Sequence, residues 1–102
     1  MARFVKVAAR NEVPDGGRGL VVETYGRQIA IFKLGDAFHA IDNRCLHEGA
    51  SLGDGFLAGA AITCPWHGWQ YDLASGVCHN NPRLRLRTFA VRIEGDDIFV
   101  DV

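Results

Sequence analysis

Two short pairs of cysteine and histidine are the residues of this 102-residue sequence that could do chemistry. The first pair is Cys45-Leu46-His47 and the second is Cys64-Pro65-Trp66-His67, with sixteen residues between them. Each pair supplies one thiolate and one imidazole from a short segment. Two sulfurs and two nitrogens complete the first shell of a soft or borderline metal centre. The spacing therefore predicts one metal site formed by Cys45, His47, Cys64 and His67.

The two pairs resemble the C-x-H…C-x-x-H signature of Rieske [2Fe–2S] proteins. The segments HEGASL and CPWHGWQYD are similar to Rieske-type ferredoxins and to the Rieske domains of aromatic-ring oxygenases, and the likeness covers nearly the whole chain. It implies one [2Fe–2S] cluster per chain, with Cys45 and Cys64 on the inner iron and His47 and His67 on the outer iron. Neutral imidazoles lower the negative charge of such a cluster, which raises its reduction potential to about −150 to +300 mV for the class.

The resemblance also suggests roles for neighbours of the ligands, because hydrogen bonds to sulfur and solvent exposure tune a cluster. Quinol-oxidising Rieske proteins carry a disulfide at the positions of Ala50 and Trp66, and that disulfide is absent here. Tyr71 matches a tyrosine whose hydroxyl reaches a ligand sulfur, so we expect it to donate to a cysteine sulfur and raise the potential modestly. Trp69 replaces a serine that bonds a bridging sulfide, and packing over the cluster region is its favoured interpretation.

Several further residues have two interpretations. Pro82 either belongs to a third loop that covers the cluster, as in the family, or is an ordinary turn proline. Cys78, like His39 and His79, is interpreted as a structural or surface residue. Three arginines alternate with leucines and form either a solvated face or a docking patch for an acidic partner, while two acidic residues of the cluster loops could steer a basic partner. These are Arg83, Arg85 and Arg87, and Glu48 and Asp54.

Period-two alternation and frequent turn residues predict an all-β domain that spans residues 1–102. The region up to residue 42 is expected to be a meander of antiparallel strands. The strands are expected at Phe4 to Ala8, Gly19 to Thr24, Gln28 to Leu34, Ala37 to Asp42, near Leu57, Ala61 to Cys64, Trp69 to Asp72, Leu84 to Glu94 and Ile98 to Val102. The resemblance implies the Rieske fold, an antiparallel β-sandwich base with a small cluster-binding subdomain at approximately residues 43–72 plus the third loop at 79–83.

The composition is that of an ordinary globular domain, with 48% hydrophobic residues and a net charge of −1. Such a balance does not indicate nucleic acid or an anionic membrane as a partner. The N-terminal MARFVKVAAR has too short an apolar run for a signal peptide, and no segment approaches the roughly 20 apolar residues of a membrane span. We therefore expect a cytoplasmic protein.

The function that the resemblance implies is that of a free-standing ferredoxin, a non-catalytic electron-transfer component of a dioxygenase system in aromatic catabolism. It would carry electrons from a flavin-dependent NAD(P)H reductase to a terminal oxygenase, with both partners docking near His47 and His67. An oxygenase would need a second iron held by two histidines and a carboxylate, and only His39 and His79 remain for it. The alternatives are a small Rieske subunit of an assimilatory nitrite reductase, which the four intact ligands disfavour, and a structural Cys₂His₂ zinc module.

Overall fold

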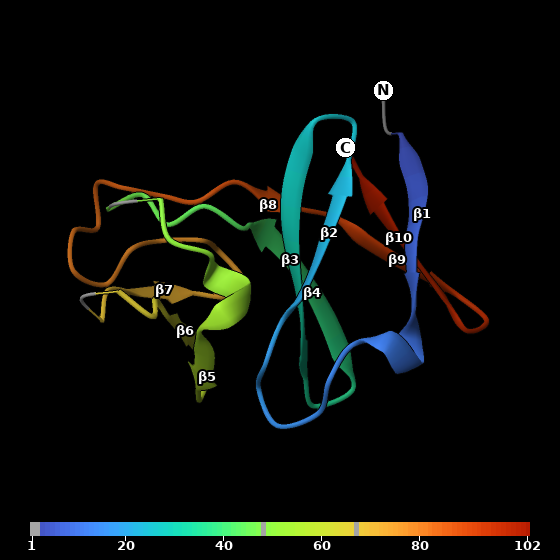
Figure 1. Ribbon diagram of the computed structural model, residues 1–102, viewed down its shortest axis with the longest axis horizontal. Helices are drawn as coiled ribbons and strands as arrows, with labels where there is room; N and C mark the ends of the chain where they lie inside the picture. The colour runs from blue at the N-terminus through green and yellow to red at the C-terminus, as the bar shows by residue number, and fades with distance from the viewer. Residues whose placement is uncertain (1–2, 48, 67) are drawn as a thin grey trace.

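The computed structural model describes residues 3–47, 49–66 and 68–102 and shows the expected all-β architecture (Figure 1). Short strands follow one another with two single-turn 3₁₀ helices between them. In chain order the elements are β1 Phe4–Ala9, η1 Arg10–Glu12, β2 Leu20–Thr24, β3 Arg27–Leu34, β4 Ala37–Asp42, η2 Leu52–Asp54, β5 Phe56–Ala58, β6 Ala61–Thr63, β7 Gln70–Asp72, β8 Thr88–Phe89, β9 Val91–Glu94 and β10 Asp97–Asp101.

The strands form three antiparallel sheets, in the orders β1-β10-β9, β2-β3-β4-β8 and β5-β6-β7. In Figure 1 the small third sheet lies to one side of the other two. The predicted meander is correct for β2 to β4 but wrong for β1, which pairs with β10 at the other end of the sequence. Alternation in β1 shows that one face is buried but does not identify the neighbouring strand.

The strand expected over Leu84 to Glu94 is also wrong in part, because regular pairing begins only at Thr88 and breaks at Ala90. At this break the chain leaves β4 and joins β10 in the other sheet. Residues 84–87 nevertheless keep the alternation: Leu86 is buried, whereas Arg85 and Arg87 are exposed. Alternation in burial without continuous pairing reflects a crossover between sheets.

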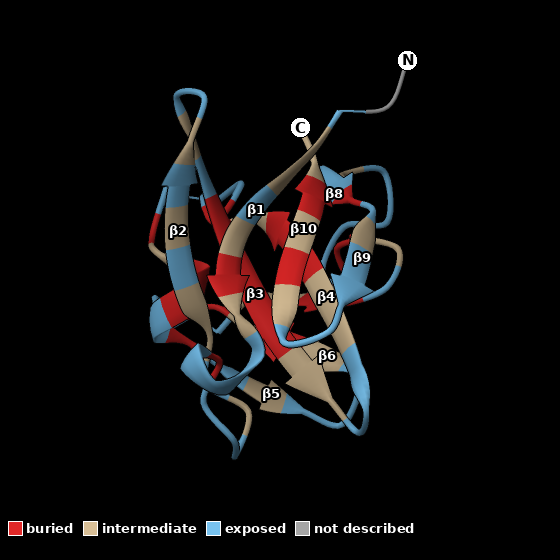
Figure 2. Ribbon diagram, turned by 90° about the vertical axis from the view of Figure 1, so that its right-hand side faces the viewer, coloured by how far each residue is buried: buried red, intermediate tan, exposed pale blue. Residues whose placement is uncertain are grey.

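Strand β3 separates two apolar cores, because four consecutive residues on it are fully buried. Ile29 and Ile31 face the core between the two larger sheets, and Ala30 and Phe32 face a second core under the small sheet. Figure 2 shows the buried residues of β3 and β10 within the larger sheets. The second core contains Cys45, Cys64 and Tyr71, so the candidate metal residues are packed on the central strand and not on a detached loop.

Candidate metal centre

The first cysteine lies in a loop that is closed by backbone hydrogen bonds. The Cys45 N–H donates to the carbonyl of Ala50 at 2.9 Å, and the Gly49 N–H donates to the carbonyl of Cys45 at 2.8 Å. The Cys45 side chain is buried, whereas Leu46 and His47 are exposed. The loop therefore places a thiol inside and an imidazole at the surface.

The second cysteine lies in a loop of the same construction between β6 and β7. The Cys64 N–H donates to the carbonyl of Trp69 at 2.7 Å, so both cysteines bond to a carbonyl five residues further along the chain. Gly68 has a φ of +72°, which favours glycine in this turn. Cys64 is buried and Trp66 is 53% exposed. His67, the fourth predicted ligand, lies outside the described residues.

Tyr71 connects the first loop to strand β7 of the small sheet. It is fully buried on β7, with its Oη 3.2 Å from the Cys45 Sγ. The Leu46 N–H donates to the same Oη at 3.1 Å, which leaves the hydroxyl hydrogen for the sulfur. Burial, followed by the hydrogen bond to Cys45, raises the pKa of Tyr71 above its ordinary value of 10.0, so the hydroxyl keeps its proton. The contact is the one expected for a donor to a ligand sulfur.

Trp69 lies against the surface histidine of the first loop. Its ring and the ring of His47 have centroids 4.4 Å apart and planes inclined by 10°, which is a stacked arrangement. The indole is half-buried and packs on the core that contains both cysteines. The sequence favoured packing of Trp69 over the cluster region, and its ring packs against His47, a candidate ligand.

Asn43 is a residue of the site that sequence reasoning missed. It is 3% exposed, and its Oδ1 accepts a hydrogen bond from the Gly53 N–H at 2.8 Å while its Nδ2 donates to Ser51 Oγ at 3.0 Å. Its backbone N–H and carbonyl pair with Gln28 and Leu52. Asn43 therefore holds both ends of the first loop against β3. An asparagine after a strand usually indicates a turn. Only the burial of its polar side chain, which the sequence does not show, distinguishes Asn43 from an ordinary turn residue.

The segment 79–83 lies beside β7. The His79 N–H donates to the Gln70 carbonyl at 2.8 Å, and the Gln70 N–H donates to Asn80 Oδ1 at 2.9 Å. Pro82 is exposed in the turn that follows. The segment is attached to the strand that carries Tyr71, and its covering of a cluster stays a prediction.

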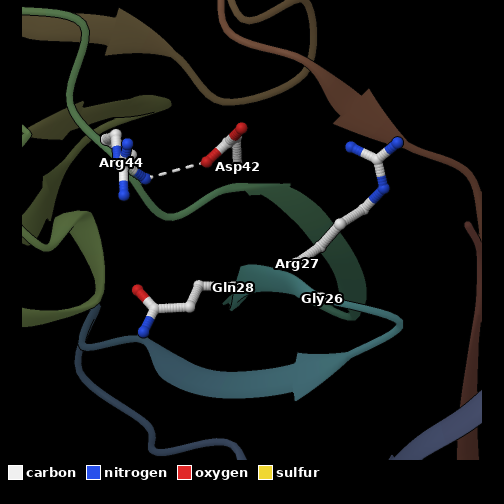
Figure 3. A pocket seen from close by; sticks show the side chains of 5 residues that line it. All are labelled: Gly26, Arg27, Gln28, Asp42 and Arg44. Atoms are coloured by element: carbon white, nitrogen blue, oxygen red, sulfur yellow. Dashed lines mark hydrogen bonds between the residues drawn. The ribbon is translucent and has the colours of Figure 1, made fainter.

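Among the remaining candidates, Cys78 belongs to the same core as Cys45, Cys64 and Tyr71 and forms an antiparallel bridge with Tyr71. Cys78 is fully buried, and its N–H donates to the Leu84 carbonyl at 3.0 Å, in agreement with a packed structural residue. The three arginines Arg83, Arg85 and Arg87 are exposed, as is Asp54, and Glu48 lies outside the described residues. A polar hollow of about 270 Å³ lies next to the first loop, where the side chain of Arg27 extends away from Arg44 (Figure 3). Of the predicted ligands that the structure describes, Cys45, His47 and Cys64, none lines it.

The described part of the site fits an iron–sulfur cluster with mixed ligands. Two thiols are buried in matching loops, one with a hydroxyl donor beside its sulfur, and an imidazole faces outward. Anionic thiolates suit the shielded side of such a group, and a neutral imidazole suits the exposed side.

Comparison with known proteins identifies the family. The Rieske [2Fe–2S] domain pattern matches residues 3–90. The chain belongs to the Rieske [2Fe–2S] ferredoxins. It is 32% identical over 102 residues to the ferredoxin component of the naphthalene 1,2-dioxygenase system of Pseudomonas aeruginosa, covering 98% of this chain and 96% of the relative. It is 38% identical over 93 residues to the 3-phenylpropionate/cinnamic acid dioxygenase ferredoxin subunit of Escherichia coli (strain K12), covering 89% and 86%.

Solved Rieske structures agree with the fold. A chain of the complex of reduced oxygenase and oxidized ferredoxin in carbazole 1,9a-dioxygenase superposes with a TM-score of 0.85 and 30% identity, covering 96% of this chain and 92% of that one. A putative nitrite reductase small subunit from Mycobacterium tuberculosis gives a TM-score of 0.90 at 24% identity, covering 100% and 96%, which is a likeness of fold alone.

Membership in the family establishes the Rieske fold and a [2Fe–2S] cofactor, and it excludes the zinc alternative as the native state. The protein is an electron carrier of the kind that serves dioxygenase systems, and not an oxygenase. Among the described residues, no helix has the length and apolar character needed to cross a bilayer.

Proposed function

We propose that this Rieske ferredoxin holds its cluster with Cys45, His47, Cys64 and His67, in a subdomain of residues 43–72 and the loop 79–83. Within a dioxygenase system, it passes single electrons from a flavin-dependent NAD(P)H reductase to a terminal aromatic-ring oxygenase. The observation that carries the proposal is the pair of matching loops, with Cys45 and Cys64 buried and His47 at the surface.

The cluster, when bound, supplies a one-electron couple, and the residues of the chain determine its surroundings. The two buried cysteines keep the sulfur side away from water. Tyr71 donates its hydroxyl hydrogen toward Cys45 Sγ, and this bond strengthens when the sulfur carries more negative charge. The exposed imidazole of His47 offers a short route for the electron to a docked protein.

The surface beside His47 is suited to a transient protein contact. Leu46 is 44% exposed and Trp66 is 53% exposed, and each is the residue immediately before a proposed histidine ligand. Apolar side chains of this kind exclude water from a small interface, and aromatic residues are enriched in such contacts. We propose that both redox partners dock here in turn, because the carbazole 1,9a-dioxygenase complex unites an oxygenase with a ferredoxin. A cytoplasmic location belongs to the same proposal, since the reductase that supplies the electrons oxidises NAD(P)H.

The test is EPR spectroscopy of the anaerobically purified protein after reduction with dithionite, followed by a redox titration of the same signal. We expect a rhombic S = 1/2 spectrum with the low average g value of mixed cysteine and histidine ligation, and a midpoint in the lower part of the Rieske range. His47→Ala and His67→Ala should each abolish that signal, whereas His39→Ala should leave it unchanged. Loss of the signal in the His39 variant alone would contradict the proposed ligand set.

The docking surface is tested with Trp66→Ser, with Ile93→Ser as the matched control on β9. We expect the first change to slow electron transfer to the terminal oxygenase about tenfold with an unaltered EPR spectrum, and the control to transfer electrons at the wild-type rate. Equal rates for both variants would argue against docking at the loop tips.

A further inference from the structure

Trp69 connects the two loops of the site in two different ways. Its backbone carbonyl accepts the N–H of Cys64 at 2.7 Å, which closes the second loop. Its ring stacks on His47 of the first loop, with centroids 4.4 Å apart and planes 10° from parallel. One residue thus contacts one loop through its backbone and the other loop through its side chain.

Other hydrogen bonds at the two loops act on different atoms from those that Trp69 contacts. The closing bonds from Cys45 to Ala50 and from Cys64 to Trp69 each lie within one loop. Tyr71 reaches across to Cys45, but it holds the sulfur and not the imidazole. The positions that match the disulfide of high-potential relatives hold a buried alanine and an exposed tryptophan, Ala50 and Trp66. The stack with the Trp69 ring gives the imidazole of His47 support from the second loop.

The ring of Trp69 is well placed to impose an orientation. It packs on the apolar core that also contains both cysteines, so its own plane is fixed by buried neighbours. A near-parallel contact leaves the facing imidazole little freedom to rotate without losing the stack. The stack also covers one face of the imidazole, which keeps water away from it.

We propose that Trp69 is a positioning residue for the ligand His47 and acts as a non-covalent clamp between the two loops. The inference rests on the proposed ligation of the cluster by His47. Because the reduced cluster carries one more negative charge than the oxidised one, admitting water beside it stabilises the reduced form. Removing the ring should therefore raise the midpoint potential, loosen the orientation of one imidazole and expose the iron.

The experiment compares Trp69→Leu and Trp69→Met with Trp69→Phe, which keeps a ring, and with Trp66→Leu, which removes the exposed tryptophan of the same loop. Each protein is purified with its cluster, and iron and sulfide are counted. The readouts are the ¹⁴N couplings of the coordinated histidines in pulsed EPR, the midpoint potential, and the rate at which a chelator removes iron.

We expect Trp69→Leu and Trp69→Met to change the ¹⁴N coupling of one histidine, to titrate at a higher potential and to lose iron several-fold faster. Trp69→Phe, which keeps a smaller ring, should lose iron at a rate between those of the wild type and the Leu and Met variants. Trp66→Leu should match the wild type in all three readouts. Wild-type couplings, potential and iron loss in the Leu and Met variants would overturn the proposal while leaving the ferredoxin assignment intact. A wild-type protein without the mixed-ligand EPR signal would instead remove the proposed function.

If neither the Leu nor the Met variant retains a cluster, the proposal is tested by the rate of iron loss from Trp69→Phe. A phenyl ring covers less of the imidazole than an indole, so its iron should be lost faster than that of the matched Trp66→Phe protein. Equal rates in these two variants would overturn the clamp.

Discussion

Tyr71 illustrates how a single hydroxyl can influence a redox centre. The Leu46 N–H occupies its oxygen, and its hydrogen is left for Cys45 Sγ at 3.2 Å. Such a bond stabilises the more negative, reduced state of a ligated sulfur, so the hydroxyl should raise the reduction potential. The resemblance to Rieske proteins, in which a tyrosine at this position reaches a ligand sulfur, allowed the contact to be expected. Its choice of Cys45 depends on how the two loops face each other, which the sequence does not specify.

We expect Tyr71→Phe to lower the midpoint potential by about 20–60 mV, because a net hydrogen bond contributes about 0.5–1.5 kcal/mol and 59 mV corresponds to a tenfold change for one electron. Potentiometric titration of the EPR signal measures the change. Tyr25→Phe, at an exposed turn, provides the control. An unchanged midpoint in Tyr71→Phe would show that the bond does not distinguish the two oxidation states.

Asn43 is the residue on which the first loop depends for its position. Asn43→Ala would leave the buried Gly53 N–H without its acceptor and remove the bond to Ser51. We expect the free energy of unfolding to fall by about 2 kcal/mol, the usual cost of an unsatisfied buried polar group. Chemical denaturation of the cluster-loaded protein measures it. Gln28→Ala removes only the longer 3.4 Å bond to the same amide and should cost much less.

At the scale of elements, local patterns predicted the strands well and the partners of strands less well. β3 is an apolar run between a turn at Gly26 and a turn at Gly35, and its bounds follow from those residues. The pairing of β1 with β10 joins residues almost a full chain length apart, and alternation carries no information about such a distance. The break at Ala90 was missed for a related reason, because a strand that changes sheets keeps its alternation.

A hydrogen-bonded turn follows Tyr71 at the end of β7. Asp72 Oδ2 accepts hydrogen bonds from the N–H and Oγ of Ser75, and these bonds hold the pKa of Asp72 below its ordinary value of 3.8. Because the folded pKa is lowered, this contribution is present above that pH and is lost only as the pH falls through the folded pKa. Ionisation of Asp72 should therefore not change the stability of the turn above about pH 5.

Gly76 completes this turn with a φ of +80°, and an added Cβ would meet the backbone carbonyl of Leu86. Gly95 has a φ of +60°, but its Cβ would enter open space. We expect Gly95→Ala to cost about 1 kcal/mol for the backbone conformation, and Gly76→Ala to cost about 3 kcal/mol because the clash adds to it. Denaturation curves of the two variants check the difference. Equal losses would mean that the segment around Leu86 moves aside freely.

At the scale of the whole molecule, the two cores have different relations to the cofactor. One contains Cys45 and Cys64, and the described residues of the other, between the larger sheets, include none of the predicted ligands. Removal of the cluster with a chelator should therefore destabilise the core that contains the cysteines more than the core between the larger sheets. Metal binding contributes to the folding free energy only of the parts that the ligands hold together.

Hydrogen exchange before and after iron removal tests this expectation. Amides at residues 45–50 and 64–69 should lose most of their protection, whereas those of β10 and the Ile29 to Ile31 part of β3 should keep theirs within about tenfold. A uniform loss of protection in all sheets would show that both cores unfold together.

The pairing of β1 with β10 brings Arg3 and Val102 together at one end of the sandwich, where the Val102 N–H donates to the Arg3 carbonyl at 3.0 Å (Figure 1). A mechanical force applied to these two residues would open the strand pair like a zipper, because the bonds of an antiparallel ladder lie across the strands and would break one after another. The hydrogen bonds of β10 with β1 and with β9 would carry the force before the other two sheets did. The loops around Cys45 and Cys64 are consequently insulated from tension at either end of the chain.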